Sequence, residues 1–152
     1  MQIRTVKYSR EKGTVEVLFT RPNGKDQETV QLQSSDLPGK AFVKAFKALD
    51  GDFRYVMHQP EDNDVEVSGI HFKESGGRDT FQLLGGIRVE AGFSSLNSPK
   101  LYEPGGDLFE GACLTDAQAK RFLAVARHAK KYVEGSRTAP VDVEVEEEAA
   151  AE

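Results

Sequence analysis

The chain has 152 residues, of which 38% are hydrophobic and 30% are charged. This length suits one domain, since domains cluster at about 100–150 residues. Nine Phe and four Tyr supply apolar volume for a core, so the composition excludes wholesale disorder. No apolar run approaches the roughly 18 residues that a membrane helix needs, so we expect no membrane contact.

The net charge of −5 hides an uneven distribution. Residues 138–152 hold six acids and no base, which leaves 19 acids against 20 bases in residues 1–137. We therefore expect a single, nearly neutral domain over 1–137 and a disordered acidic tail over 138–152.

The start of the chain and its cysteine content indicate a cellular compartment. No apolar segment with a small-residue cleavage site follows Met1, so we expect no secretory signal. The single cysteine, Cys113, cannot form an internal disulfide, and one thiol makes no structural zinc site. The expected location is the reducing cytoplasm.

The first third of the chain predicts three antiparallel strands. Apolar residues alternate over 3–8, 14–20 and 29–33, and turn residues such as Gly13 and Gly24 separate these segments. A strand meander is therefore expected.

A helix is predicted next. Pro38 lies in its first turn, Phe42 and Phe46 repeat at helical spacing, and Gly51 is expected to end it. A short strand over 53–57 is predicted to follow.

The second half predicts further strands and a final helix. We expect strands over 65–72 with a bulge at Gly69, over 81–93 with a bulge or a sharp bend at two adjacent glycines, and over 98–102 at a sheet edge. The two adjacent glycines are Gly85 and Gly86. The fold predicted from these segments is α+β, with a mainly antiparallel sheet of about six strands, two helices and the order β-β-β-α-β-β-β-α.

The last helix has the clearest start signal. Thr115 and Gln118 match a capping box, in which each side chain satisfies a backbone amide at the helix start. An apolar stripe that includes Phe122 and Ala129 follows, and Gly135 is expected to close the helix.

Catalytic and metal-binding patterns are absent from the sequence. His58, His71 and His128 fall on three different predicted elements, and none has a cysteine or a second histidine at ligand spacing. The acidic run over 61–64 lacks the order of a calcium loop. We expect no enzyme, no cofactor and no metal.

Basic side chains on the exposed side of both predicted helices are the main positive signal. Lys40, Lys44 and Lys47 repeat at helical spacing in the first helix, and the last helix carries a wider stripe. The stripe of the last helix contains Lys120, Arg127 and Lys131, broadened by Arg121 and Lys130. Such surfaces attract a polyanion, so these residues are predicted to contact nucleic-acid phosphates. Lysines that serve only solubility are the plain alternative.

Two arginines near paired glycines offer a different possibility. Arg78 follows Gly76 and Gly77, and Arg88 follows Gly85 and Gly86. These turns could bind an anion and sequester nucleotides, although tight hairpin geometry explains the glycines as well.

The acidic tail suggests regulation of binding. Six carboxylates on a flexible segment compete with nucleic acid for a basic surface. This tail is similar to those of many single-stranded-DNA-binding proteins, but its tip, 149–152, lacks the apolar anchor that those tails use to recruit partners.

Four segments together resemble a family of small accessory proteins of tailed bacteriophages. They are 3–8, 42–49, 67–72 and 96–99, and the likeness spans residues 1 to about 135. The resemblance implies a non-enzymatic phage product in the bacterial cytoplasm, and it carries over no catalytic residue. We expect it to bind nucleic acid, preferably single-stranded DNA. The alternatives are an adaptor, inhibitor or DNA mimic that binds a host protein, and a nucleotide-sequestering protein. A homo-oligomer is also possible.

Overall fold

The computed structural model describes residues 1–75, 77–104 and 113–135. Seven strands and three helices occur in these ranges. In chain order they are β1 (Gln2–Ser9), β2 (Thr14–Asn23), β3 (Asp26–Ser34), α1 (Lys40–Lys47), α2 (Leu49–Val56), β4 (Asp64–Ser75), β5 (Arg78–Val89), β6 (Gly92–Asn97), β7 (Leu101–Tyr102) and α3 (Asp116–Val133). The predicted α+β class is confirmed.

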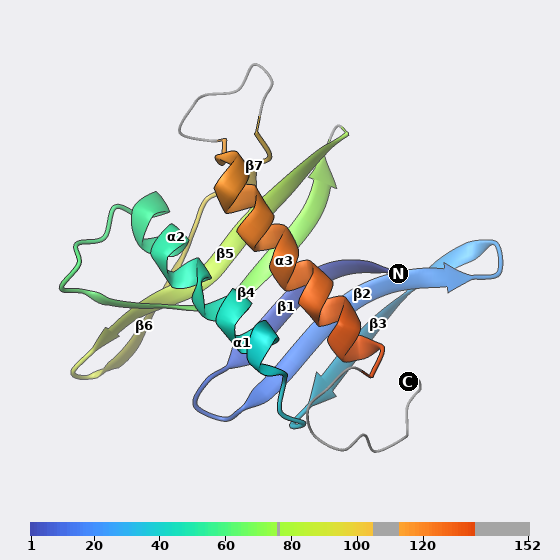
Figure 1. Ribbon diagram of the computed structural model, residues 1–152, viewed down its shortest axis with the longest axis horizontal. Helices are drawn as coiled ribbons and strands as arrows, with labels where there is room; N and C mark the ends of the chain where they lie inside the picture. Colours follow the sequence, from blue (N-terminus) through green and yellow to red (C-terminus); the bar gives the residue numbers. More distant parts are fainter. Residues whose placement is uncertain (76, 105–112, 136–152) are drawn as a thin grey trace.

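The strands form one antiparallel sheet with the order β3-β2-β1-β4-β5-β6, and β7 pairs with β5. All three helices lie against one face of this sheet, with α3 running diagonally beside α1 and α2 (Figure 1). The opposite face carries no helix, and we call it the open face. Each half of the chain is thus a three-strand meander followed by helix, and the two meanders join where β1 pairs with β4.

Alternation of apolar residues explains which face of the sheet is covered. Val15, Val17 and Phe19 of β2 are buried, and they pair with residues of β1 that point toward the helices. Among these, Val6 pairs with both Val17 and Ile70, so the core lies under the helices at the centre of the sheet.

The first predicted helix does not stop at Gly51. Only Ala48 separates α1 from α2, and the predicted strand over 53–57 is wrong because this segment is helical. Leu49 and Phe53 are both fully buried and stand one helical turn apart. Their burial outweighs the cost of a glycine in a helix, which is about 1 kcal/mol.

The predicted bulge at Gly69 is confirmed, since the register of β4 on β5 shifts between Val67 and Gly69. The capping box is also confirmed. Thr115 Oγ1 accepts a hydrogen bond from the Gln118 amide at 3.1 Å, and the Thr115 amide donates to Gln118 Oε1 at 2.9 Å. Local sequence signals therefore set both features.

β5 passes through Gly85 and Gly86, where a bulge or a sharp bend was predicted, without interruption. The register shift in this part of the sheet lies on β4 between Val67 and Gly69, which pair with Gly85 and Leu84. A Cβ at Gly85 would lie 2.6 Å from the Glu66 carbonyl oxygen and 3.1 Å from the Phe53 ring. At Gly86 it would lie 2.2 Å from the Ser94 carbonyl oxygen. The glycines are needed because neighbouring groups approach the strand closely, not because it bends.

The predicted edge strand over 98–102 is present as β7. The acidic tail predicted over 138–152 lies outside the described residues, and so does the domain boundary predicted at 137.

Candidate nucleic-acid interface

Two of the helices that carry the predicted basic residues lie side by side. The rings of Phe42 in α1 and Tyr132 in α3 have centroids 5.9 Å apart. The Tyr132 hydroxyl donates a hydrogen bond of 2.8 Å to the carbonyl oxygen of Asp36, ahead of α1. The last turns of α3 are thereby fixed next to α1 on the same face of the sheet (Figure 1).

The lysines and arginines of α1 and α3 are exposed to solvent. Phe42 and Phe46 of α1 and Phe122 and Ala129 of α3 are buried, so the opposite sides of both helices face solvent. The exposed cations there are Lys40, Lys44, Lys47, Lys120, Arg127, Lys130 and Lys131, which together we call the basic helix surface. Within the described part of the chain, none of them takes part in an ion pair.

The environment of His128 reflects this concentration of positive charge. Burial lowers the pKa of His128, and the nearby charges of Arg127 and Lys131 lower it further. Asp116 and Glu134 are the exposed acids of α3, and they lie at its two ends. The cations Lys120, Arg127 and Lys131 therefore lie between these two acids.

Arg121 was predicted to bind phosphate, but it is occupied by Asp52 of α2. Its Nε and Nη2 donate to the two carboxylate oxygens of Asp52 at 2.9 and 2.7 Å. The hydrogen bond to Asp52 raises the pKa of Arg121. The Asp52 side chain is only 5% exposed, so this pair ties α3 to α2 and is not a free cation for a ligand.

Arg78 and Arg88 do not form the anion site that the sequence suggested. They lie near opposite ends of β5, ten residues and about 33 Å apart along an extended strand. Arg78 donates to the Glu103 carbonyl oxygen at 2.7 Å. Arg88 pairs with Glu66 at 3.3 Å, and its guanidinium lies 5.5 Å from the centroid of the Phe93 ring. No single nucleotide can contact both arginines.

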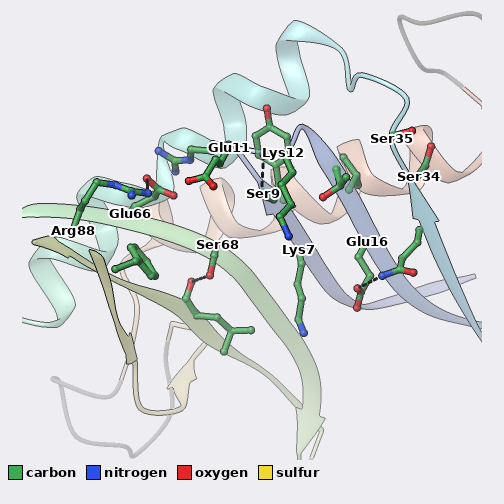
Figure 2. Close-up of a pocket in the computed structure, with 17 residues that line it drawn as sticks. Lys7, Ser9, Glu11, Lys12, Glu16, Ser34, Ser35, Glu66, Ser68 and Arg88 are labelled. Carbon is green, nitrogen blue, oxygen red and sulfur yellow. Dashed lines mark hydrogen bonds and ion pairs between the residues drawn. The ribbon is translucent and has the colours of Figure 1, made fainter. Parts of the chain in front are cut away.

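A large groove of about 840 Å³ lies beside the β1–β2 hairpin (Figure 2). Both signs of charge line it, from Lys7, Arg10, Lys12, Arg88, Glu11, Glu16 and Glu66. Three of its serines bond within the fold: Ser9 Oγ accepts from the Lys12 amide, Ser34 Oγ accepts from the Asp36 amide, and Ser68 donates to the Leu84 carbonyl oxygen. We call this the mixed-charge groove, and its balance of charge gives it no preference for an anion.

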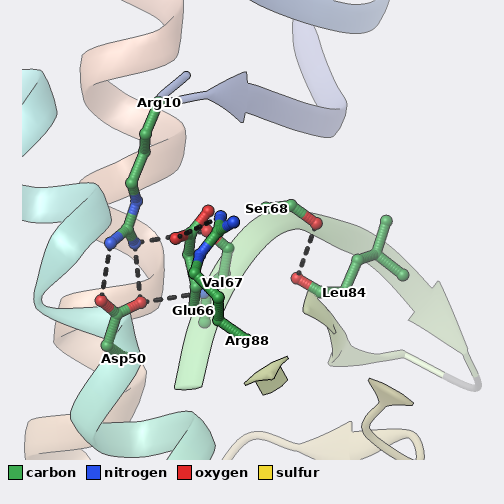
Figure 3. A network of polar contacts seen from close by, with 7 residues as sticks. All are labelled: Arg10, Asp50, Glu66, Val67, Ser68, Leu84 and Arg88. Atoms are coloured by element: carbon green, nitrogen blue, oxygen red, sulfur yellow. Dashed lines mark hydrogen bonds and ion pairs between the residues drawn. The ribbon is translucent and has the colours of Figure 1, made fainter. Parts of the chain in front are cut away.

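Arg10, which lines this groove, also forms an ion pair within the fold. Arg10 makes two hydrogen bonds to Asp50 of α2, at 2.7 and 2.8 Å, and a third to the Val67 carbonyl oxygen (Figure 3). Asp50 in turn accepts a hydrogen bond from the Val67 amide at 2.9 Å. Burial acts to lower the pKa of Arg10, but the hydrogen bond and charge of Asp50, with smaller contributions from Glu66 and Tyr8, together raise it. Arg10 therefore fastens the hairpin to α2 and to the β4 bulge.

A second pocket, of about 640 Å³, lies on the open face between β1–β2 and β4–β5. Its cations are Arg4, Lys73 and Lys100, and none of the described residues that line it is acidic. We call it the basic pocket. The sequence did not single out these three residues, because they stand on three separate segments with no shared spacing.

Comparisons with protein-family models, with curated proteins and with solved structures found no match. In the described ranges, no helix is long and apolar enough to cross a membrane, and no group of three or more His, Cys, Asp or Glu could hold a metal ion. The protein is thus an antiparallel sheet covered on one face by three helices, two of which carry the exposed cations of the basic helix surface.

Proposed function

We propose that this protein is a non-enzymatic accessory protein that binds single-stranded nucleic acid through the basic helix surface. The observation that supports this most is the placement of α1 and α3 on the same face of the sheet, both with cations directed to solvent. Cations from two elements then act on one ligand, as backbone-phosphate binding requires.

The lack of ion pairs at these positions, within the described residues, supports the proposal. Arg10, Arg88 and Arg121 are each paired with an acid, whereas the cations of the basic helix surface make no ion pair within the described residues. A cation that holds no carboxylate can exchange its counterions for phosphates, and the release of those counterions drives binding.

The end of α3 also supports a role for the acidic segment. Tyr132 and Val133 bring the chain to the side of α1, and the six acids of residues 138–152 follow shortly after. A segment tethered there has a high effective concentration at the basic helix surface. We propose that it competes with nucleic acid and so limits binding to long or abundant strands.

The test is a salt titration of binding to a labelled single-stranded oligonucleotide, followed by fluorescence anisotropy. One cation from each helix is removed in Lys44→Gln/Lys131→Gln. We expect weaker binding and a log–log salt slope that is less steep by about 1.4, since each single-strand phosphate contact contributes about 0.7.

The matched control is Lys12→Gln/Lys25→Gln, which removes two exposed lysines in the β1–β2 and β2–β3 turns, outside the basic helix surface. It changes the net charge equally and is expected to leave the slope unchanged. A flat salt response of the unmodified protein, or equal effects of the two double variants, would overturn the proposal.

A further inference from the structure

The pairing between β1 and β4, at the centre of the sheet, is short. The two strands pair at only three positions, Thr5 with His71, Val6 with Ile70 and Lys7 with Gly69. The register of β1 on β2 shifts between Ile3 and Thr5, at the point where β1 leaves β4. The start of β1 and the end of β4 are therefore not paired with each other.

Pockets lie on both sides of this unpaired part of the sheet and share part of their walls. Phe72, Lys73, Thr80 and Phe81 line both the basic pocket on the open face and a pocket of about 340 Å³ on the helix side. The helix-side pocket is also lined by Arg127 and Lys130 of the basic helix surface. Asp79 is the one acid among the described residues that line the helix-side pocket, beside the three cations Lys73, Arg127 and Lys130. Lys73 lines both pockets, so it links the cations of α3 to the open face.

The basic pocket is built from groups that suit a nucleotide. Arg4, Lys73 and Lys100 supply positive charge for a phosphate, which no described carboxylate of the lining opposes. Hydroxyl and amide side chains complete the wall, namely Thr5, Thr20, Thr29, Thr80 and Gln82. Thr80 Oγ1 already donates to the Lys73 carbonyl oxygen and Gln82 Nε2 to the Ser98 carbonyl oxygen, both at 3.0 Å. Thr20 and Thr29 are the hydroxyls that we expect to bind base edges or sugar.

Two buried polar groups in the wall differ in their hydrogen bonding. His71 Nδ1 and Thr5 Oγ1 are 2.8 Å apart, so this pair is already satisfied. Thr20 Oγ1 is buried and has no hydrogen-bond partner among the described residues. Unsatisfied hydroxyls are rare in protein interiors, and this one marks the pocket wall as a place where a polar ligand completes the bonding.

The volume of the basic pocket favours a single strand over a duplex. A volume of about 640 Å³ lies in the range of small-molecule sites, roughly 300–1,000 Å³. A site of this size admits one unpaired nucleotide, whereas a duplex presents bases that are already stacked and paired. The mixed-charge groove is larger, but three acids line it and would repel phosphate.

We propose that the basic pocket holds one nucleotide of a bound single strand, with its phosphate toward Arg4, Lys73 and Lys100. This inference rests on the proposed function and adds a reason for preferring single strands over duplex. The strand runs from the basic helix surface past Arg127 and Lys130, and its end or a turned-out nucleotide enters the pocket.

The test uses a 12-nucleotide single strand, a duplex of the same sequence, a free nucleoside monophosphate and inorganic phosphate as probes. The pocket variant is Lys73→Gln/Lys100→Gln, because both lysines are exposed and removing their charge leaves the core intact. The helix variant Lys44→Gln/Lys131→Gln and the control Lys12→Gln/Lys25→Gln are measured beside it.

We expect the pocket variant to lose about tenfold in affinity for the single strand and much less for the duplex, as two lost phosphate contacts imply. The helix variant should weaken both forms similarly. Chemical shifts of the Thr5 and His71 amides should move when the single strand binds, and less when the monophosphate binds.

The remaining outcomes separate the two proposals. If the helix variant weakens binding and the pocket variant matches the control, the basic helix surface stands and the pocket is not a nucleotide site. If the unmodified protein binds no strand but the monophosphate shifts Thr5 and His71, the proposed function fails and the pocket is a free-nucleotide site. Binding of inorganic phosphate with equal strength would overturn nucleotide recognition.

Discussion

The role of each charged residue in this protein depends on the residues that it contacts. Lys131 and Arg121 belong to the same helix and looked alike in the sequence, yet one is exposed without an ion pair and the other holds a carboxylate that is 5% exposed. A buried carboxylate is stable only while its partner remains. Arg121 is thus a structural residue.

Replacing Arg121 with Ala should destabilise the fold. The change leaves Asp52 buried without its partner, and we expect the free energy of unfolding to fall by about 2 kcal/mol, below the range for fully buried pairs because water reaches Arg121, which is 43% exposed. Urea denaturation measures this. Arg127→Ala, at an exposed position without an ion pair, should stay within about 0.5 kcal/mol of the unmodified protein. Equal effects would contradict the assignment.

Two histidines should make the fold sensitive to mild acid. Burial lowers the pKa of His71, with a smaller contribution from Lys7, and burial also lowers that of His128. The unfolded chain binds protons more readily at these sites, so their contribution is intact above pH 6.5, the ordinary histidine pKa, and is lost as the pH falls below that value toward the lowered pKa.

The check compares urea midpoints at pH 7.5, 6.5 and 5.5. The double variant His71→Gln/His128→Gln should lose less stability between pH 6.5 and pH 5.5 than the unmodified protein does. Carboxylates titrate in both proteins, so the difference between the two curves isolates the histidines. Parallel curves would show that the folded pKa values are not lowered.

At the scale of elements, two glycines have a different role in the structure from the one that the sequence predicted. Gly51 was expected to end a helix but lies exposed within α2, with nothing within 4 Å of an added Cβ. Gly86 was expected to bend a strand but lies in continuous β5, where an added Cβ would meet the Ser94 carbonyl oxygen. The sequence around each glycine does not show whether neighbouring groups approach it closely.

Alanine substitution at these two glycines should therefore have opposite effects. Gly51→Ala should raise the free energy of unfolding by about 0.5–1 kcal/mol, because alanine favours the helix and restricts the unfolded chain. Gly86→Ala should lower it by at least about 2 kcal/mol, since backbone must move to admit the methyl group. Thermal unfolding of both variants decides this, and a stable Gly86→Ala protein would contradict the close packing of β5 and β6.

At the scale of the whole molecule, charge is divided between surfaces. Several arginines form ion pairs that join elements, as in Arg10 with Asp50 and Arg121 with Asp52. Within the described ranges, the lysines of α1 and α3 take part in no ion pair. This division supports a surface kept open for a polyanion, with the acids of residues 138–152 as its competitor within the chain.

Removing residues 138–152 should tighten binding to a single-stranded oligonucleotide, by about three- to tenfold at low salt, because a tethered competitor is lost. The gain should shrink as salt rises, since both interactions are screened. A full-length control in which the six acids become Gln or Asn separates charge from length and should behave like the truncation. Tighter binding of the truncation alone, or no change in either protein, would contradict this competition.

The sequence by itself determined the features that depend on neighbours a few residues away. Alternation of Val15, Val17 and Phe19 determined a half-buried strand, the Thr115–Gln118 pair determined the start of α3, and helical spacing put the lysines on the exposed sides of two helices. It misled at 53–57, where aromatic and β-branched residues suggested a strand although their burial follows helical spacing.

Only the tertiary structure decided which distant residues meet. Arg121 reaches Asp52 across 69 positions of the chain, and Arg4, Lys73 and Lys100 line one pocket because β1 and β4 are neighbours in the sheet. The physical reason is that short-range periodicity indicates which side of a helix or strand is buried. Strand order and helix placement determine which other residues that side is buried against, and both depend on the packing of the whole core.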